Sequence, residues 1–134
     1  MNILNPGPGV GGHCIAVDPW FIVATSPEQA RLIRTAREVN DSKPGYVVRS
    51  VVDAVAALGP ETRIACFGLT YKPDVDDFRE SPALQVAREL VERYPGRVTC
   101  VDPYHEALAH SGEPCDGILF QSAEEALASA NLIV

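Results

Sequence analysis

Residues 27–58 carry apolar side chains at intervals of three, four or their multiples, which is the spacing of one face of a helix. These positions are Ala30, Ile33, Val39, Val47, Val51, Val55 and Leu58. Ser26 and Pro27 supply a cap and a first-turn proline, so we expect the helix to begin there. Pro44 and Gly45 interrupt the pattern and leave two alternatives, two successive helices or one long bent helix. A continuous helix would reach roughly 48 Å, a length typical of helices that bridge domains or form a dimer seam.

After residue 59 the pattern changes to short apolar runs that alternate with helical segments. Strands are expected in TRIACFG, RVTCVD, GILF and LIV, and helices from Ser81 to about Arg93 and over Ala123 to Ala130. A short segment near Glu106 to His110 lies between the second and third of these strands. Repeated strand and helix units predict a parallel sheet of the Rossmann-like, doubly wound kind, in which ligands bind at the carboxyl ends of the strands. The predicted fold class is therefore α/β, with a long helix that leads into a Rossmann-like parallel-sheet domain.

The first expected strand runs into GLTYKPDVDDFRESPA, which leaves about a dozen residues before the next helix cap. Such a length is unusual for a connection between a strand and a helix and favours a functional loop. Its Lys72 and Arg79 stand where an anionic ligand would lie. The loop lacks the GxGxxG glycines, so we expect no standard dinucleotide site in this sheet.

A cysteine follows a run of glycines in PGVGGHCIAVDPWF, residues 8–21. Glycines admit close approaches of the backbone, so a loop of this kind can wrap a thiol tightly around a ligand. Asp18 lies four residues after Cys14, which places both on one face if a helix begins at Ile15. A thiolate can act as a nucleophile while a nearby carboxylate holds or activates a water molecule. The alternative is a tight turn followed by an ordinary buried cysteine.

The other metal-ligating and acidic residues have simpler interpretations. His13 next to Cys14 does not favour a metal site, because adjacent residues rarely direct both ligands to one ion. The acidic residues of 74–77 lack the turn glycine and distal glutamate of a calcium loop and are expected to be solvated. Asp102, after the second expected strand, either binds a ribose or forms a turn with Pro103.

The remaining cysteines are expected to have no catalytic role. Cys66 and Cys100 lie in strand-like runs and should be buried, and Cys115 lies in a turn. No CxxC pair is present.

Composition narrows the classes of partner and compartment. The net charge is −7 at a sequence pI near 4.8, and the 11 Lys and Arg residues are scattered, so we expect no nucleic-acid partner. No apolar run reaches the roughly 20 residues needed to span a bilayer, and no signal peptide is evident, which predicts a cytoplasmic protein without membrane association. The chain begins directly in the glycine loop and ends in an expected strand, so we expect a piece of a longer protein.

Three motifs, GPGVGGHCIAVDPWF, AREVNDSKP and GLTYKPDVDDFRESPA, resemble in this order those of the UDP-glucose/GDP-mannose dehydrogenase family. The resemblance covers nearly the whole chain from Asn5 onward. It implies a nucleotide-sugar 6-dehydrogenase that oxidises a primary alcohol to a carboxylate in two steps, each passing a hydride to NAD. The form GGHCIAVDPWF is most similar to members that act on UDP-N-acetylmannosamine. UDP-N-acetylglucosamine, UDP-glucose and GDP-mannose stay open as alternative substrates, as does a non-catalytic nucleotide-binding or dimerisation module.

The resemblance also implies roles for individual residues. Cys14 matches the catalytic nucleophile, Asp18 the acid that positions water or shuttles protons, and Gly11 a substrate contact. Tyr71 and Lys72 match a Phe-Lys pair that contacts the UDP-sugar. The tyrosine departs from the family's phenylalanine only in its added hydroxyl group. A further match, Arg79, corresponds to an arginine that reaches the NAD.

The domain organisation follows from the same resemblance and from the change of pattern near residue 59. Residues 1–58 are expected to be the C-terminal part of a central helical dimerisation domain with the catalytic cysteine loop. Residues 59–134 are expected to be a UDP-sugar-binding Rossmann-like domain, truncated at its C-terminus. NAD would be bound mainly by an N-terminal domain outside this sequence, so this chain alone should be inactive. We further expect a homodimer formed through the long helix.

Overall fold

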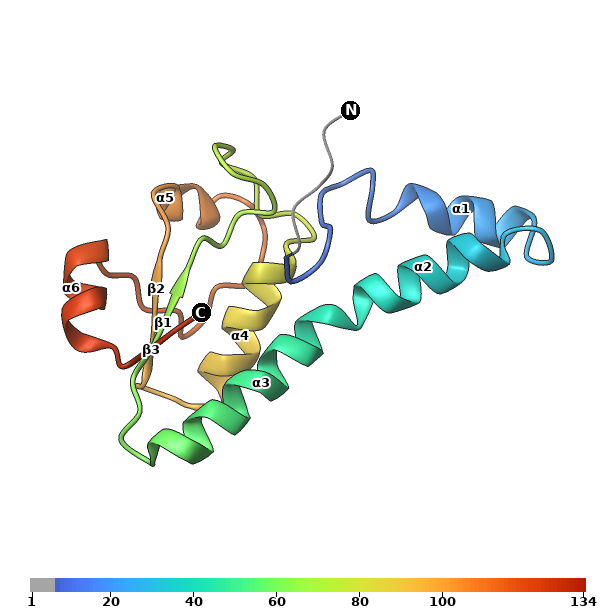
Figure 1. Ribbon diagram of the computed structural model, residues 1–134. Helices are drawn as coiled ribbons and strands as arrows, with labels where there is room; N and C mark the ends of the chain where they lie inside the picture. The colour runs from blue at the N-terminus through green and yellow to red at the C-terminus, as the bar shows by residue number, and fades with distance from the viewer. Residues whose placement is uncertain (1–6) are drawn as a thin grey trace.

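A helical arm leads into a body built on a small parallel sheet (Figure 1). The computed structural model describes residues 7–134. The elements are α1 (Asp18–Thr25), α2 (Arg31–Asp41), α3 (Lys43–Leu58), β1 (Ile64–Phe67), α4 (Pro82–Arg93), β2 (Val98–Val101), α5 (His105–Leu108), α6 (Ala123–Ser129) and β3 (Leu132–Ile133). The order of helices and strands is that of an α/β fold, as the sequence predicted.

The long helix is present as two helices that run end to end along one line (Figure 1). Only Ser42 separates α2 from α3, and its φ of −78° and ψ of −13° are nearly helical. Pro44 lies in the first turn of α3, where a proline has no hydrogen bond to lose. The predicted start at Ser26 is wrong, because Ser26 is the C-cap of α1 and α2 begins at Arg31.

The sheet has the strand order β2-β1-β3, and both pairings are parallel. Ile64 pairs with Val98 on one side and with Leu132 on the other. Figure 1 shows α4 and α3 on one side of the sheet and α6 on the opposite side. The expected strand in GILF is wrong, because this segment forms only a single bridge, between Phe120 and Cys100. The helix that follows β1, α4, and the helix that precedes β3, α6, thus lie on opposite faces of the sheet. The carboxyl end of β1 is therefore at the point where the connections change face, which is the usual place for a ligand.

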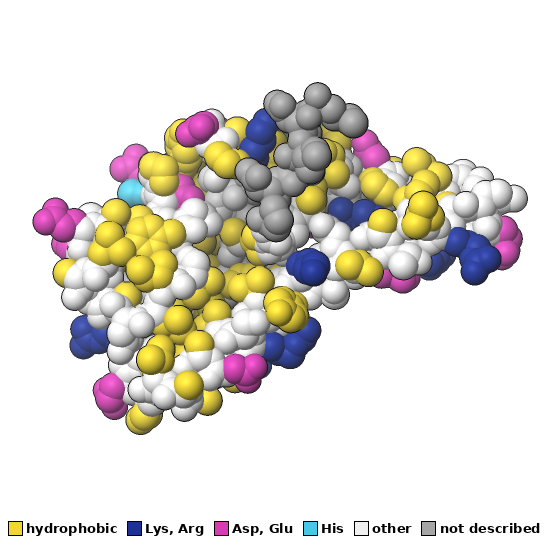
Figure 2. Space-filling view, viewed as in Figure 1, with side chains coloured by type: hydrophobic (Ala, Val, Ile, Leu, Met, Phe, Trp, Pro, Cys, Tyr) yellow, Lys and Arg dark blue, Asp and Glu magenta, His cyan; other side chains and the backbone are white. Residues whose placement is uncertain are grey.

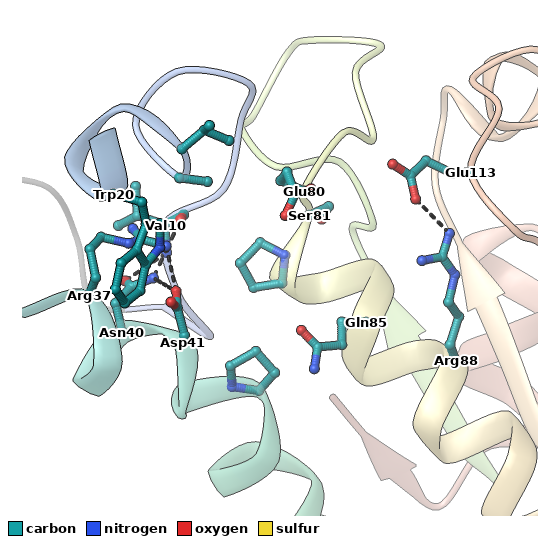
Figure 3. A pocket seen from close by; sticks show the side chains of 14 residues that line it. Val10, Trp20, Arg37, Asn40, Asp41, Glu80, Ser81, Gln85, Arg88 and Glu113 are labelled. Carbon is teal, nitrogen blue, oxygen red and sulfur yellow. Dashed lines mark hydrogen bonds and ion pairs between the residues drawn. The ribbon is translucent and has the colours of Figure 1, made fainter. Parts of the chain in front are cut away.

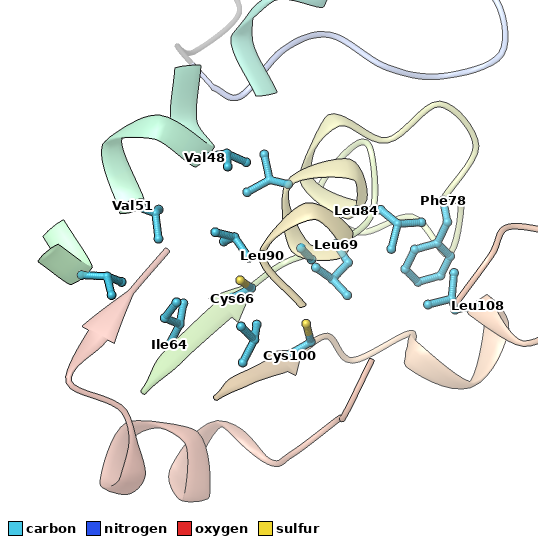
Figure 4. Packing of buried hydrophobic residues seen from close by; sticks show 14 residues of the cluster. Val48, Val51, Ile64, Cys66, Leu69, Phe78, Leu84, Leu90, Cys100 and Leu108 are labelled. Atoms are coloured by element: carbon cyan, nitrogen blue, oxygen red, sulfur yellow. The ribbon is translucent and has the colours of Figure 1, made fainter. Parts of the chain in front are cut away.

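The core lies between the sheet and the helices α3 and α4 (Figure 4). Its largest fully buried side chains include Phe78, Ile64, Leu69 and Leu84. Cys66 and Cys100 face each other in register on β1 and β2, and both are buried, as their strand-like surroundings predicted. A hydrogen bond with Cys66, together with burial, raises the pKa of the Cys100 thiol, so this cysteine remains an uncharged core residue.

The arm has little core of its own. The only residue of α1 that is buried is Val23, and the only one of α2 is Arg37. Apolar side chains lie on its surface instead, and Figure 2 shows several of them over the arm. Phe21 is 67% exposed and Leu32 is 81% exposed. Exposure of this extent is typical of a surface that packs against other protein.

Among residues 7–134, none of the helices combines the length and the apolar character that crossing a membrane requires.

Candidate active site

The cysteine loop, which we define as residues 8–17, packs directly against the β1–α4 loop, residues 68–81. A Cβ atom on Gly11 would lie 2.1 Å from the backbone oxygen of Glu80, and one on Gly12 would lie 2.9 Å from Cε2 of Tyr71. The backbone N–H of Gly12 donates to the carbonyl of Arg79 at 3.2 Å. Side chains at positions 11 and 12 would therefore separate the two loops, which explains the need for glycine.

Glu80 holds its part of this contact in an unusual backbone conformation. Its φ of 51° lies in the left-handed region, which a glutamate rarely adopts. Such strain persists only where the surroundings determine the backbone closely. The carbonyl of Glu80 is consequently fixed against Gly11.

The base of the β1–α4 loop is closed by two polar side chains. The carboxylate of Asp102, at the end of β2, accepts the N–H groups of Leu69 at 2.7 Å and Thr70 at 3.3 Å through Oδ2, and that of Tyr104 at 2.8 Å through Oδ1. The hydroxyl of Ser81 donates to the carbonyl of Leu69 at 2.7 Å and accepts from the first turn of α4. Asp102 is thus engaged by the backbone, which supports the turn interpretation over ribose binding.

A cavity of about 540 Å³ opens at the carboxyl end of β1. Its lining combines the ends of two neighbouring strands, Phe67 and Val134, with Tyr71, Lys72 and the proline Pro82 at the start of α4. This is the position at which open parallel sheets bind their ligands. Its mostly apolar wall and the exposed cation of Lys72 suit a flat base joined to an anionic group.

Cys14 is exposed, so the alternative of an ordinary buried cysteine is wrong. Its carbonyl accepts the N–H of Asp18 at 2.8 Å, so a helical turn joins the two residues although α1 begins only at Asp18. Both side chains are open to solvent. Neither residue lines the cavity at β1, which Pro8 and Gly9 of the cysteine loop border.

Arg79 lies between the cysteine loop and the acidic part of the β1–α4 loop. Its guanidinium forms a two-pronged ion pair with the carboxylate of Asp77, with Nε 2.9 Å from Oδ1 and Nη2 2.5 Å from Oδ2. These hydrogen bonds lower the pKa of Asp77 to about 2 and raise that of Arg79.

A second cavity, of about 480 Å³, separates the arm from α4 (Figure 3). Trp20, Arg37 and Asn40 form one wall, and Ser81 and Gln85 lie opposite. Arg37 and Asn40 also bond to the cysteine loop, through the carbonyl of Ile15 and the backbone of Val10. This wall joins the loop to the arm.

Across the described part of the chain, no three His, Cys, Asp or Glu side chains gather in a way that would hold a metal ion.

The structure places Gly11 against Glu80, and its neighbour Gly12 against Tyr71 and the carbonyl of Arg79, while Lys72 lines the cavity at β1 together with Tyr71. Cys14 is exposed within the cysteine loop, and Asp18, also exposed, is the first residue of α1 after this loop. Three residues that support these groups, Arg37, Asn40 and Glu80, were not predicted from the sequence, and Ser81 was expected only as the start of α4. Arg37 and Asn40 stand in the motif AREVNDSKP, which signalled the segment without giving a role to either side chain.

Fold and site together define an α/β protein with a ligand cavity at the switch point of its sheet and a glycine-bound cysteine loop beside it. The sequence profile for the "UDP-glucose/GDP-mannose dehydrogenase family, UDP binding domain" matches residues 65–134, and the profile for the central domain of this family matches residues 1–42. The chain belongs to the UDP-glucose/GDP-mannose dehydrogenase family.

Curated relatives match the whole chain but extend well beyond it. An NDP-N-acetyl-D-galactosaminuronic acid dehydrogenase from Ralstonia solanacearum is 54% identical over 134 residues, which are 100% of this chain and 31% of the relative. A UDP-N-acetyl-D-mannosamine dehydrogenase from Salmonella typhi is 51% identical over 142 residues, covering 100% of this chain and 33% of the relative. The chain therefore spans about a third of the length of the curated relatives it matches.

Solved structures of dehydrogenases share the fold. A UDP-N-acetyl-mannosamine dehydrogenase from Staphylococcus aureus superimposes with a TM-score of 0.72 at 44% identity, over 99% of this chain and 29% of that one. A UDP-glucose dehydrogenase from Pyrobaculum islandicum superimposes with a TM-score of 0.78 at 28% identity, over 95% of this chain and 30% of that one.

Proposed function

We propose that this chain is the part of a nucleotide-sugar 6-dehydrogenase that carries the nucleophile and the nucleotide pocket. The observation that carries the proposal is the direct contact between the cysteine loop and the β1–α4 loop, through Gly12, Tyr71 and Arg79. A nucleotide bound at the end of β1 would extend its sugar along Tyr71 and Lys72 toward this contact. The sugar would then reach the exposed Cys14.

In the proposed chemistry, a primary alcohol is first oxidised to an aldehyde, and the Cys14 thiolate adds to its carbon. The resulting thiohemiacetal is oxidised to a thioester, and water hydrolyses the thioester to release the carboxylate and restore the thiol. Asp18, one helical turn from Cys14, holds the water and takes up its proton. NAD, when bound, accepts one hydride in each of the two oxidations, so two NAD are consumed.

The β1–α4 loop lacks the glycine-rich turn of a standard dinucleotide site. Gly68 follows β1 with a φ of 76°, but nothing lies within 4 Å of the place of its Cβ, and no further close-approach glycine follows in the β1–α4 loop. Arg79 would contact the cofactor from this chain, in exchange for part of its pairing with Asp77. NAD is bound mainly by a domain outside these residues, so this chain by itself does not catalyse the reaction.

For the substrate we propose UDP-N-acetylmannosamine. The names of two similar proteins, from Salmonella typhi and Staphylococcus aureus, refer to this sugar, and both match almost the whole chain. The similarity to the Ralstonia solanacearum protein keeps other N-acetylated sugar nucleotides as alternatives.

We further propose two units, residues 1–58 as the end of a dimerising helical domain and residues 59–134 as a UDP-sugar-binding domain. The apolar side chains exposed on α1 and α2 support a homodimer through the arm. The cytoplasm, where nucleotide sugars are made and used for polysaccharide synthesis, is the compartment that fits this role.

The test is a titration of the isotopically labelled chain with UDP-N-acetylmannosamine, UDP-glucose, GDP-mannose and NAD, followed by backbone amide shifts. We expect shifts at residues 67–72 and at Val134 with the UDP-sugars, and little response to NAD. Lys72→Met should weaken binding about tenfold because a charged hydrogen-bond donor is lost. Lys43→Met, which changes the other lysine, exposed on α3, serves as the matched control. Shifts outside the cavity, or none with any sugar nucleotide, would contradict the proposal.

A further inference from the structure

We propose that Asn40 is a positioning residue for Cys14, because it fixes the cysteine loop to the arm, with Arg37 as a second anchor. The consequence for catalysis rests on the proposed function, whereas the anchoring itself does not. From the sequence alone, no residue of α2 was expected to contribute to the site.

The Asn40 side chain pairs with the backbone of Val10 in both directions. Its Oδ1 accepts the Val10 N–H at 2.9 Å, and its Nδ2 donates to the Val10 carbonyl at 3.4 Å. The amide thus replaces the pairing that a neighbouring strand would give. Figure 3 shows Val10 and Asn40 next to each other at the wall of the second cavity.

Arg37 binds the same loop on the other side of the cysteine. Its Nη1 donates to the carbonyl of Ile15 at 3.4 Å, and its Nη2 pairs with the carboxylate of Asp41 one turn along α2. Arg37 is only 9% exposed, and its buried Nε has no partner among the described residues. A guanidinium buried to this degree is held in place by its surroundings, so it is a rigid anchor.

The two anchors enclose the reactive segment. Asn40 holds Val10 and Arg37 holds Ile15, so the residues between them, Gly11 to Cys14, are tied to α2 at both ends. The opposite side of this segment rests on the β1–α4 loop through Gly12. The position of Cys14 relative to Arg79 therefore depends on the arm as well as on the nucleotide-binding body.

Polar anchors are needed here because apolar packing is sparse. The core cluster contains no residue of α1 or α2 among the described residues. The hydrogen bonds from Asn40 and Arg37 therefore hold the cysteine loop in its conformation. An error of about 1 Å in the position of a nucleophile is enough to slow a reaction strongly.

The first experiment uses this chain and three variants, Asn40→Ala, Asn40→Asp and Asn131→Ala. Asn131 is the matched control, because its Oδ1 accepts a backbone N–H, that of Arg63, at 2.7 Å at the start of β1, away from the cysteine loop. Asn40→Asp keeps the acceptor for the Val10 N–H and loses the donor. Hydrogen exchange at the Val10 amide should accelerate about fivefold in Asn40→Ala, the change expected for one lost hydrogen bond, and far less in the other two.

The second readout is the alkylation of Cys14 by iodoacetamide, divided by that of Cys115, which is also exposed. The anchored loop holds the exposed Cys14 thiol in one set of surroundings, so freeing the loop from α2 should change this ratio more than twofold in Asn40→Ala. Asn40→Asp should retain most of the wild-type ratio, and Asn131→Ala all of it. Unchanged Val10 exchange and an unchanged ratio in Asn40→Ala would overturn the proposal, whatever the protein catalyses.

The third experiment tests the catalytic consequence, in a chain that includes the NAD-binding part. Asn40→Ala should lower kcat at least tenfold with less than a threefold change in KM for the sugar nucleotide, because Asn40 touches the loop and not the nucleotide cavity. Asn40→Asp should restore most of kcat. Equal activity of Asn40→Ala and wild type would overturn the positioning role. A wild type without NAD-dependent oxidation would overturn the proposed function instead and leave the anchoring to be judged by exchange and alkylation.

Discussion

Gly12 lies against the ring of Tyr71 so closely that a Cβ atom at position 12 would be 2.9 Å from Cε2 and 3.1 Å from Cδ2 of the ring. The two residues are 59 positions apart in the sequence and belong to the two loops that carry the proposed chemistry. Their contact links the proposed nucleophile to the proposed nucleotide pocket.

Gly12→Ala is expected to destabilise the protein by about 2 kcal/mol, through backbone strain at a φ of 91° and through the clash with Tyr71. Gly59→Ala is the matched control, because Gly59 has a φ of 106° and nothing within 4 Å of its Cβ position. Urea unfolding measures both. Tyr71→Leu in the Gly12→Ala background should recover part of the loss. Equal losses for the two glycines would show that the Tyr71 contact is unimportant.

Asp102→Asn is expected to lower the free energy of unfolding by about 1–3 kcal/mol. Both carboxylate oxygens of Asp102 accept backbone N–H groups, so an amide nitrogen in either position would face a donor. Asp53→Asn on the exposed side of α3 is the control and should stay within about 0.5 kcal/mol of the wild type. The measurement is urea unfolding at neutral pH, and equal values for the two variants would disprove the role of Asp102.

The ion pair between Asp77 and Arg79 predicts a pH dependence. The pKa of Asp77 is lowered from 3.8 to about 2, so the carboxylate contributes stability above its ordinary pKa, and this contribution is lost as the pH falls toward 2. A carbon-detected NMR titration should give a midpoint near 2 for the Asp77 carboxyl. Arg79→Gln should raise the midpoint toward 3.8. A midpoint that stays near 2 in this variant would show that another group lowers the pKa.

The exposed arm predicts self-association. Phe21→Glu combined with Leu32→Glu should shift the protein from dimer to monomer in light scattering across a range of concentrations, because both side chains are apolar and exposed. Neither change should reduce the stability of the monomer. Leu119→Glu, which charges another exposed leucine, outside the arm, is the control and should leave the mass unchanged. A wild-type chain that is monomeric at all concentrations would contradict the proposed dimer.

Local pattern was sufficient to predict most of the fold. The alternation after residue 59 correctly indicated β1, α4 and β2, because buried strands and a capped amphipathic helix leave clear periodic signals. Tertiary context decided the rest. Ser26 has the composition of an N-cap but ends α1, and the apolar run GILF, with Leu119 exposed, gains only one bridge to β2.

For the site, the sequence indicated the loops but not their contact. Cys14, Lys72 and Arg79 stand in segments with unusual glycine content or length, so they were visible as candidates. Asn40 was not, because a polar residue near the end of a polar helix looks solvent-exposed until the cysteine loop is placed on it. Its role becomes evident only from the hydrogen bond between Asn40 and Val10, which are 30 positions apart in the sequence.

The closed base of the β1–α4 loop has a consequence for protein engineering. Leu69 is fixed by Asp102 on its N–H and by Ser81 on its carbonyl, so the two ends of the segment are joined independently of what lies between them. Residues 72–76, which exclude the buried Phe78 and the contacts of Tyr71 and Arg79 with the cysteine loop, can therefore be exchanged as a cassette for the corresponding segment of another member of the family, with the sheet and α4 left intact. Grafting such segments onto this scaffold tests whether the loop contributes to the proposed binding of a sugar nucleotide.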